Sequence, residues 1–208
     1  MNTSQRIWNP GPMHMKVVTR ETNVFVNFIK PESDLENLII NDSEWQEGAI
    51  WGEPRSGHPE GKIIYHIHEV LENVDKATNS WKLRQQLRLV TILHDTFKHL
   101  EETARPRTDW SKHHAIFAVN FAKKYVKDQA VLDVITAHDD AFYAWRASYA
   151  GQHEKSAQLL DDLREKMGEN MQLFYLFFKC DTQTGDKYQS PVHWFEQVMQ
   201  DEISLTNF

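Results

Sequence analysis

Apolar side chains recur every three or four residues through most of the chain beyond residue 62, and this spacing favours α-helices over strands. The clearest stripe contains Ile63, Ile67, Val70, Leu71 and Val74. The same period predicts further helices over residues 83–93, 111–122, 131–135, 141–149, 154–167 and 171–180, and a last helix that begins after Ser190 and Pro191. Ser80 precedes the helix expected over residues 83–93 and is a plausible N-cap residue for it. We therefore predict an all-α fold.

The N-terminal part of the chain lacks this regularity. Residues 1–33 contain three prolines and a β-leaning segment at residues 24–26, so we expect an extended arm that leads into a short helix over residues 35–40. Residues 45–62 hold several glycines and prolines and are expected to form an irregular loop, as are the polar residues 101–109. At 208 residues the chain can bury one sizeable core and is too short for two ordinary domains.

The net charge, the cysteine content and the absence of long apolar stretches limit which partners and which cellular location we expect for this protein. The formal net charge of -7 argues against binding to long nucleic acid, which requires clustered Lys and Arg, although bound metal ions could still attract a small phosphorylated ligand. The single Cys180 can form no internal disulfide. The first thirty residues lack the apolar core of a signal peptide, and no stretch approaches the roughly 18 apolar residues of a membrane span. We expect a cytoplasmic protein without a membrane partner.

Several histidines and aspartates fall on helical faces that are otherwise apolar. These residues are His66, His94, His114, His138 and Asp181. One such histidine alone is more often a hydrogen-bonded core residue. A buried carboxylate, however, needs a cation, a metal or a water-filled cavity beside it, because burying it unpaired costs several kcal/mol. Together, imidazole nitrogens and carboxylate oxygens form the ligand set of zinc, iron, manganese and similar ions.

The local sequence around these residues resembles that of a known family. The segments YHIHEVLENV, LVTILHDTFKH, HHAIFAVNFA and FFKCDTQTG follow in the order of the H…HD…H…H…D signature of the HD-domain superfamily of metal-dependent phosphohydrolases. The stretch GHPEGKIIYHIHEVL is also similar to the start of the HD domain of some tRNA nucleotidyltransferases. The resemblance implies an HD-domain helical bundle over residues 57–187, after an N-terminal arm and loop over residues 1–56. A C-terminal helix within residues 188–208 would pack on the same domain.

The resemblance also implies a metal site with one or two divalent ions, chosen from Mn, Fe, Ni, Co, Zn and Mg. The ligands of the first ion would be His66, His94 and Asp181, the second ion would be held by His114 and His138, and Asp95 would bridge the two. Two positions depart from the family pattern. Phe97 replaces the glycine of HDxGK, and His113 competes with His114 for the third histidine position.

Other residues are candidates for contacts with a substrate. Besides Asp95, we expect Lys98, Arg146 and His58 to take part in catalysis: Lys98 and Arg146 by binding phosphate, and His58, with Glu60, as a proton donor or substrate contact. The simpler alternatives are a solvated surface lysine at Lys98 and an amphipathic helix around Arg146 whose aromatic residues belong to the core.

Groups of less direct importance also occur in these segments. Tyr143 or Trp145 could stack a base beside Arg146. We interpret His68, Asp139 and Asp140 as residues that orient the ligands or lie on the surface.

The leading functional hypothesis is a phosphohydrolase that cleaves a phosphomonoester or phosphodiester of a nucleotide or similar small molecule. A diiron oxygenase is an alternative, because the same His and Asp set serves oxygen chemistry. A non-catalytic metal- or nucleotide-binding module is the third. Seven tryptophans and eleven phenylalanines leave both a monomer and an oligomer open.

Overall fold

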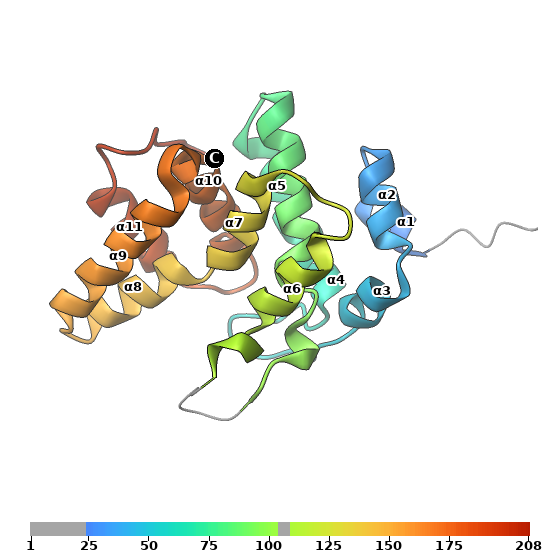
Figure 1. Cartoon of the computed structure of the whole chain (residues 1–208), viewed down its shortest axis with the longest axis horizontal. Coiled ribbons are helices and arrows are strands. Elements are labelled where there is room, and N and C mark those ends of the chain that lie inside the picture. Colours follow the sequence, from blue (N-terminus) through green and yellow to red (C-terminus); the bar gives the residue numbers. More distant parts are fainter. Residues whose placement is uncertain (1–23, 104–108) are drawn as a thin grey trace, which may run out of the picture.

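The computed structural model describes residues 24–103 and 109–208, and across these two ranges it contains helices, turns and loops but no β-strand. The α-helices are α1 (Val24–Ile29), α2 (Asp34–Ile40), α3 (Ser43–Ala49), α4 (Ile63–Ala77), α5 (Trp81–Leu93), α6 (His114–Ala122), α7 (Gln129–Ala137), α8 (Asp140–Tyr149), α9 (His153–Met167), α10 (Met171–Thr182) and α11 (Ser190–Val198). Short 3₁₀ turns cover Lys98–Leu100, Trp110–Lys112 and Gly168–Asn170. The all-α prediction is confirmed (Figure 1).

The central helices begin and end close to where the apolar period placed them. Ser80 caps α5 by accepting a hydrogen bond from the backbone N–H of Leu83, as predicted. The helix expected from residue 111 begins three residues later, because Trp110–Lys112 forms a 3₁₀ turn and the His113 side chain caps α6. Pro191 lies in the first turn of α11, where its missing N–H leaves no hydrogen bond unmade.

The predictions for the N-terminal region need correction. Residues 24–29 form helix α1 rather than a β-leaning arm, because α1 packs on α4 and buries Ile29. The rest of the expected arm, residues 1–23, lies outside the described residues. The expected loop over residues 45–62 is helical as far as Ala49 and irregular after it. Trp45 explains the difference, since it is fully buried and its indole N–H donates to the carbonyl oxygen of Ile92 at 2.8 Å.

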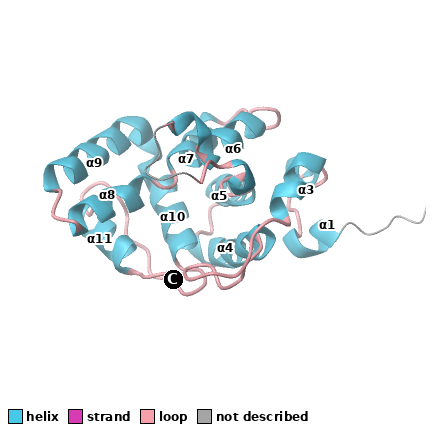
Figure 2. Cartoon of the chain, turned by 90° about the horizontal axis from the view of Figure 1, so that it is seen from below, coloured by secondary structure: helices cyan, strands magenta, loops and turns pink. Residues whose placement is uncertain are grey.

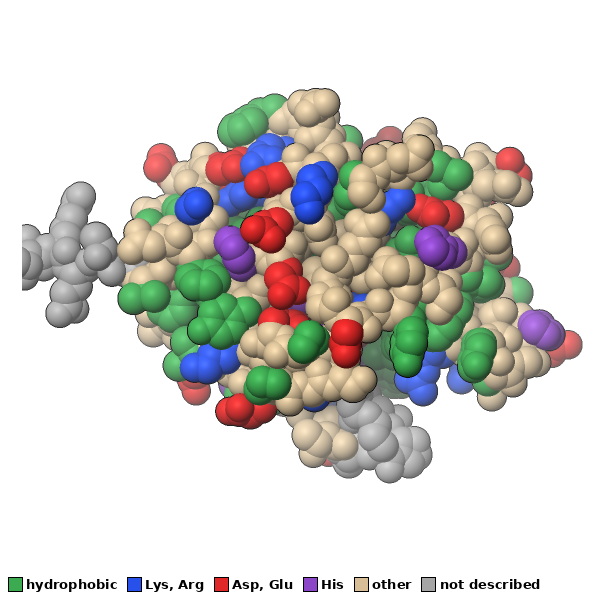
Figure 3. All heavy atoms as spheres, turned by 180° about the vertical axis from the view of Figure 1, so that it is seen from behind, with side chains coloured by type: hydrophobic (Ala, Val, Ile, Leu, Met, Phe, Trp, Pro, Cys, Tyr) green, Lys and Arg blue, Asp and Glu red, His purple; other side chains and the backbone are tan. Residues whose placement is uncertain are grey.

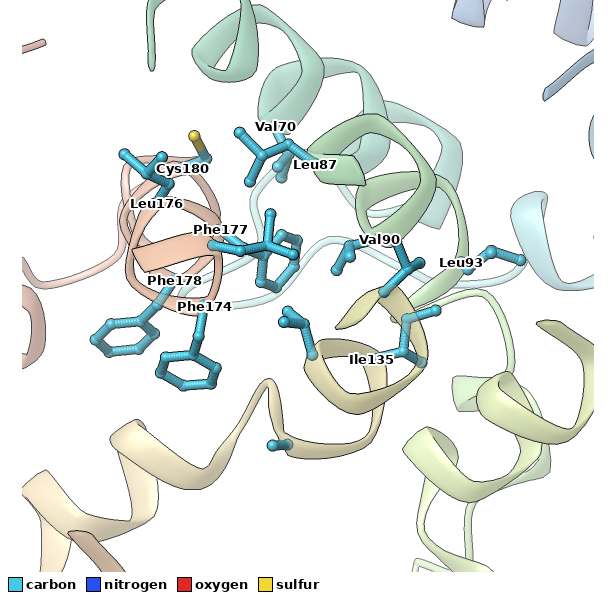
Figure 4. Packing of buried hydrophobic residues seen from close by; sticks show 14 of the residues in the cluster. Val70, Leu87, Val90, Leu93, Ile135, Phe174, Leu176, Phe177, Phe178 and Cys180 are labelled. Carbon is cyan, nitrogen blue, oxygen red and sulfur yellow. The ribbon is translucent and has the colours of Figure 1, made fainter. Parts of the chain in front are cut away.

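The helices are arranged in three groups, one at each end of the molecule and one in its centre. Figure 1 shows α1, α2 and α3 at one end and α8, α9 and α11 at the other, with α4, α5, α7 and α10 between them, and Figure 2 shows the same order from another side for the helices that it labels. In the centre, Val90 of α5, Ile135 of α7 and Phe177 of α10 belong to one buried apolar cluster (Figure 4). None of the described helices has the length and apolar character to cross a membrane. The packed centre fixes the ends of α4, α5, α7 and α10 relative to one another.

Gly48 is required by helix packing rather than by a turn. A Cβ added to Gly48 would lie 1.8 Å from the carbonyl oxygen of Thr96, so α3 touches the backbone just after residues 94 and 95. Helix propensity alone predicts that Gly48→Ala stabilises the protein by about 1 kcal/mol. We expect the opposite, a loss of about 1 to 3 kcal/mol, because two backbones must separate.

Thermal unfolding tests this sign, since each kcal/mol shifts the midpoint of a domain this size by roughly 2 to 4 °C. Glu47→Ala, at the exposed neighbouring position of the same helix, is the control and should change the midpoint little. A higher midpoint for Gly48→Ala would contradict the packing argument.

Candidate metal centre

Three helix ends bring one group of candidate metal ligands together. His66 lies in the first turns of α4, His94 and Asp95 follow the last residue of α5, and Asp181 lies at the end of α10. The Nε2 atom of His66 is 2.9 Å from Oδ1 of Asp181 and 3.7 Å from Oδ2 of Asp95. The Nε2 atom of His94 is 3.4 Å from the same Asp95 oxygen and 3.7 Å from Oδ1 of Asp181. These four side chains form the first half of the centre.

A second group lies on the other side of Asp95. Its Oδ1 atom is 3.2 Å from Nε2 of His114 and 3.5 Å from Nε2 of His138. The two imidazole Nε2 atoms are 3.0 Å apart. Each carboxylate oxygen of Asp95 therefore faces a different pair of histidines, which is the arrangement required of a bridging ligand.

The structure also separates the two adjacent histidines. His114 belongs to the second half of the centre, as described above. His113 instead caps α6 through its Nδ1, which accepts from the backbone N–H of Ala115, and its Nε2 is 3.1 Å from the hydroxyl of Tyr143. His114 is thus the better placed of the two to face Asp95.

Hydrogen bonding leaves the inward atoms free to bind a cation. The Nδ1 atoms of His94 and His138 donate to the carbonyl oxygens of Thr91 and Ile135, at 3.0 and 2.8 Å. This bond holds the His94 ring so that its Nε2 faces the centre without a hydrogen bond, whereas Nε2 of His138 faces Nε2 of His114 at 3.0 Å. Three buried atoms of the cluster make no hydrogen bond: Nε2 of His66, Nε2 of His94 and Oδ1 of Asp95. Since unsatisfied buried polar atoms are rare, this donor set fits a metal ion.

Neighbouring charges keep the carboxylates of the centre ionised. Burial alone would raise the pKa of Asp95, but the neighbouring His94 and Lys98 hold it well below its ordinary value. Burial likewise opposes ionisation of Asp181, and Lys187 and His66 lower its pKa. Burial lowers the pKa of His94, which favours its neutral form. Burial also opposes a charge on His66 and His138, but Asp181 and Glu60 raise the pKa of His66, and Asp139 and Asp95 raise that of His138 to about 9. A divalent cation at this centre would therefore displace the protons of these two rings.

Further carboxylates support the ligands from outside. Oε1 of Glu60 is 3.4 Å from Nδ1 of His66 and 2.9 Å from Nδ1 of His58. Glu101 accepts a hydrogen bond from Nδ1 of His114 at 2.7 Å. Carboxylates in this position orient ligating imidazoles and raise their basicity. Glu60 and Glu101 are thus placed to orient His66 and His114, and Glu101 was not singled out from the sequence.

The centre opens into a cavity of about 300 Å³. Asp95, His138, Asp139 and Asp181 form part of its lining. Its apolar wall consists of Phe142, Trp145, Phe178, Tyr188 and Pro191. His58, Lys98 and Lys187 also line the polar side. The cavity thus joins the ligand cluster to an apolar surface.

Both lysines of the cavity contact ligand carboxylates. The Nζ atom of Lys98 is 2.5 Å from Oδ2 of Asp95, and that of Lys187 is 3.0 Å from Oδ1 of Asp181. Lys98 therefore lies in the site as expected. Lys187 carries no sequence motif and lies in the loop after α10, so the helical pattern could not single it out.

Arg146 is the one proposed catalytic residue that the structure places elsewhere. It lines a separate surface groove with Trp110, Tyr143 and Lys155, and its guanidinium lies 5.8 Å from the centre of the Phe142 ring. Arg146 follows His138 by eight residues, but α7 ends at Ala137 and α8 begins at Asp140, so the spacing of one helix does not continue into the next.

The remaining candidates divide between surface and site. His68 pairs with Glu72 on the surface, and Asp140 pairs with Lys166. Asp139, which the sequence suggested as an outer or surface group, faces the second half of the centre directly.

Comparisons of the chain with protein-family models, with curated proteins and with solved structures find no match. Evidence for function therefore comes from the geometry of the site and the local sequence resemblance. Both concern the same residues, since the buried groups that could hold a metal ion include His66, His94, Asp95, His114 and His138.

Proposed function

We propose that this protein is a metal-dependent phosphohydrolase that cleaves a phosphomonoester or phosphodiester of a small molecule, such as a nucleotide. The observation that carries the proposal is the group of three buried atoms without hydrogen bonds, on His66, His94 and Asp95, beside a cavity that also contains two lysines. Of the common metal-site chemistries, hydrolysis uses this combination of N and O ligands with adjacent cations.

The residues around the centre can be given separate tasks. His66, His94, Asp95 and Asp181 would hold a divalent ion, with His114 and His138 on the other side of Asp95. Such an ion supplies Lewis acidity toward phosphoryl oxygens and makes water acidic enough to be a nucleophile near neutral pH.

The lysines would bind the anionic part of the substrate. Lys98 and Lys187 each lie against a ligand carboxylate and line the cavity, so their ammonium groups can turn to phosphoryl oxygens once a metal ion neutralises Asp95 and Asp181. His58 lines the same cavity and keeps Nε2 available, because its Nδ1 contacts Glu60. It would contact the leaving group.

The apolar wall suits the organic part of the substrate. Phe142 and Trp145 stack on each other with ring centres 5.6 Å apart and an angle of 29°. Together with Tyr188 they offer flat surfaces to a ring such as a base. A volume near 300 Å³ is at the small end of ligand cavities. On the face shown in Figure 3, the described acidic and basic side chains are interspersed, which favours a small substrate over a long nucleic acid.

Dependence of ester cleavage on metal tests the proposal. The protein is purified without chelator, its metals are determined by elemental analysis, and phosphate or p-nitrophenol release is measured from mono- and diesters. We expect release that falls to background after dialysis against chelator and returns with Mn, Ni, Co or Mg. His94→Ala should remove it, whereas His68→Ala, a matched change on the surface of α4, should not.

The other outcomes separate the alternatives. Two bound irons without release from any ester would favour the oxygenase. A protein with neither metal nor turnover would be a binding module, and release that persists in His94→Ala would reject this centre as the site of hydrolysis.

A further inference from the structure

Asp139 occupies a position where its ordinary role would be to cap a helix. It is the N-cap residue of α8, and Asp is among the residues preferred there because its carboxylate accepts from the first free backbone N–H groups. In this structure the Asp139 side chain makes no such capping hydrogen bond. The helix start therefore does not explain the residue.

The carboxylate of Asp139 is directed at the histidines instead. Its Oδ2 atom is 3.6 Å from Nε2 of His114 and 3.6 Å from Nε2 of His138, and these two nitrogens are themselves 3.0 Å apart. The same oxygen is 3.4 Å from Nε2 of His113 and 3.5 Å from the hydroxyl of Tyr143. Asp139 also lines the cavity, and 30% of its side chain is exposed there.

We propose that Asp139 is a direct ligand of a second metal ion, together with His114, His138 and the shared Asp95. Each half of the centre then contains the same donors. The first half has two histidines and Asp181, the second half has two histidines and Asp139, and Asp95 belongs to both. Asp139 gives the second half a carboxylate of its own, as Asp181 does for the first half.

The chemistry of the donors supports two ions of one kind. Two nitrogens and two oxygens suit Mn²⁺, Fe²⁺, Co²⁺ or Zn²⁺, and four protein ligands leave room for water or substrate on ions that accept five or six. Without Asp139, the second ion would have two imidazoles and a shared carboxylate, and we expect it to bind more weakly than the first. With Asp139, two ions should bind with comparable affinity.

A different role for Asp139 is an ion pair with a protonated histidine. In that role Asp139 would touch no metal ion, so Asp139→Asn would leave the number of bound ions and their affinity unchanged. The two roles thus predict different effects of one substitution on metal binding.

The test counts ions and does not require turnover. The proposal rests on the metal centre of the proposed function but not on hydrolysis, so a failed ester assay and a failed metal titration remain distinguishable. Metal-free full-length protein is titrated with Mn²⁺ by calorimetry and by equilibrium dialysis with elemental analysis. Electron paramagnetic resonance then detects the spin coupling of two neighbouring Mn²⁺ ions.

The variants are Asp139→Asn and, as a matched control, Asp140→Asn. Asp140 is the next residue and pairs with Lys166 at 2.7 Å, away from the cluster. We expect two ions and a coupled signal in the wild type and in Asp140→Asn. In Asp139→Asn one ion should keep its affinity, the other should bind at least about 10-fold more weakly, and the coupled signal should be lost.

Two results would overturn the proposal: uptake of one ion by the wild type, or two ions of wild-type affinity in Asp139→Asn. Circular dichroism of each metal-free variant shows whether it is folded. Asp139→Ser provides a second way to remove the carboxylate if the asparagine variant does not fold.

Discussion

Asp95→Asn is expected to lower phosphate release by at least about 1000-fold, with little change in the fold. The two oxygens of Asp95 face opposite halves of the centre, 3.2 Å from His114 and 3.4 Å from His94. An asparagine has nearly the same shape but carries no charge and offers one oxygen. A metal ion supplies several kcal/mol of transition-state stabilisation, and about 4 kcal/mol corresponds to 1000-fold in rate.

Steady-state release of phosphate at saturating Mn²⁺, together with the metal content, measures this effect. Asp133→Asn is the control, because Asp133 lies on α7 and accepts a hydrogen bond from Gln129 away from the centre. It should retain wild-type rates. If Asp95→Asn kept more than one tenth of the wild-type rate, Asp95 would not be the shared ligand on which the proposed mechanism depends.

The ligand cluster could be predicted because its members share a simple pattern. Spacing placed His66, His94, His138 and Asp181 on helix faces that are otherwise apolar, and the resemblance to the HD-domain superfamily implied that they belong to one ligand set. The structure brings these side chains together with Asp95 and His114. Their role as metal ligands remains a proposal that the titration above tests.

The residues that were missed lie where the helical period is interrupted. Asp139 lies at the break between α7 and α8, Lys187 follows α10, and Glu101 follows a 3₁₀ turn. At such positions the sequence spacing does not predict where a side chain points, because the backbone no longer follows a helix. The same break explains why Arg146, eight residues after His138, does not line the cavity.

Of the three N-terminal helices, α2 matches the helix expected over residues 35–40, whereas α1 and α3 were not predicted. Glycines and prolines near residues 48–61 indicated a loop, but Gly48 is inside α3 because Thr96 leaves no space for a side chain. Contacts between residues far apart in the sequence determine the structure of this N-terminal region, and local composition does not predict such contacts. The buried pair of Arg88 and Glu36 is another such contact, since the two residues are 52 positions apart.

Arg88→Ala is expected to lower the free energy of unfolding by about 3 to 5 kcal/mol. Arg88 of α5 is 3% exposed and Glu36 of α2 is 1% exposed. The guanidinium donates to both oxygens of Glu36, the closest at 2.8 Å, and to the carbonyl oxygen of Lys30 at 3.1 Å. Removing it leaves the Glu36 carboxylate buried without a counter-charge, which is the expensive way to break such a pair.

Arg84→Ala, one turn earlier on the same helix, separates this effect from the loss of a surface arginine. Arg84 contacts Glu32 and Asp75 with its side chain 22% exposed, so it should contribute about 1 kcal/mol or less. Urea unfolding of both variants gives the comparison. The double change Arg88→Met with Glu36→Leu should recover most of the loss, because it removes both charges and keeps the volume. A loss in Arg88→Ala no larger than that in Arg84→Ala would show that the buried pair does not hold α2 against α5.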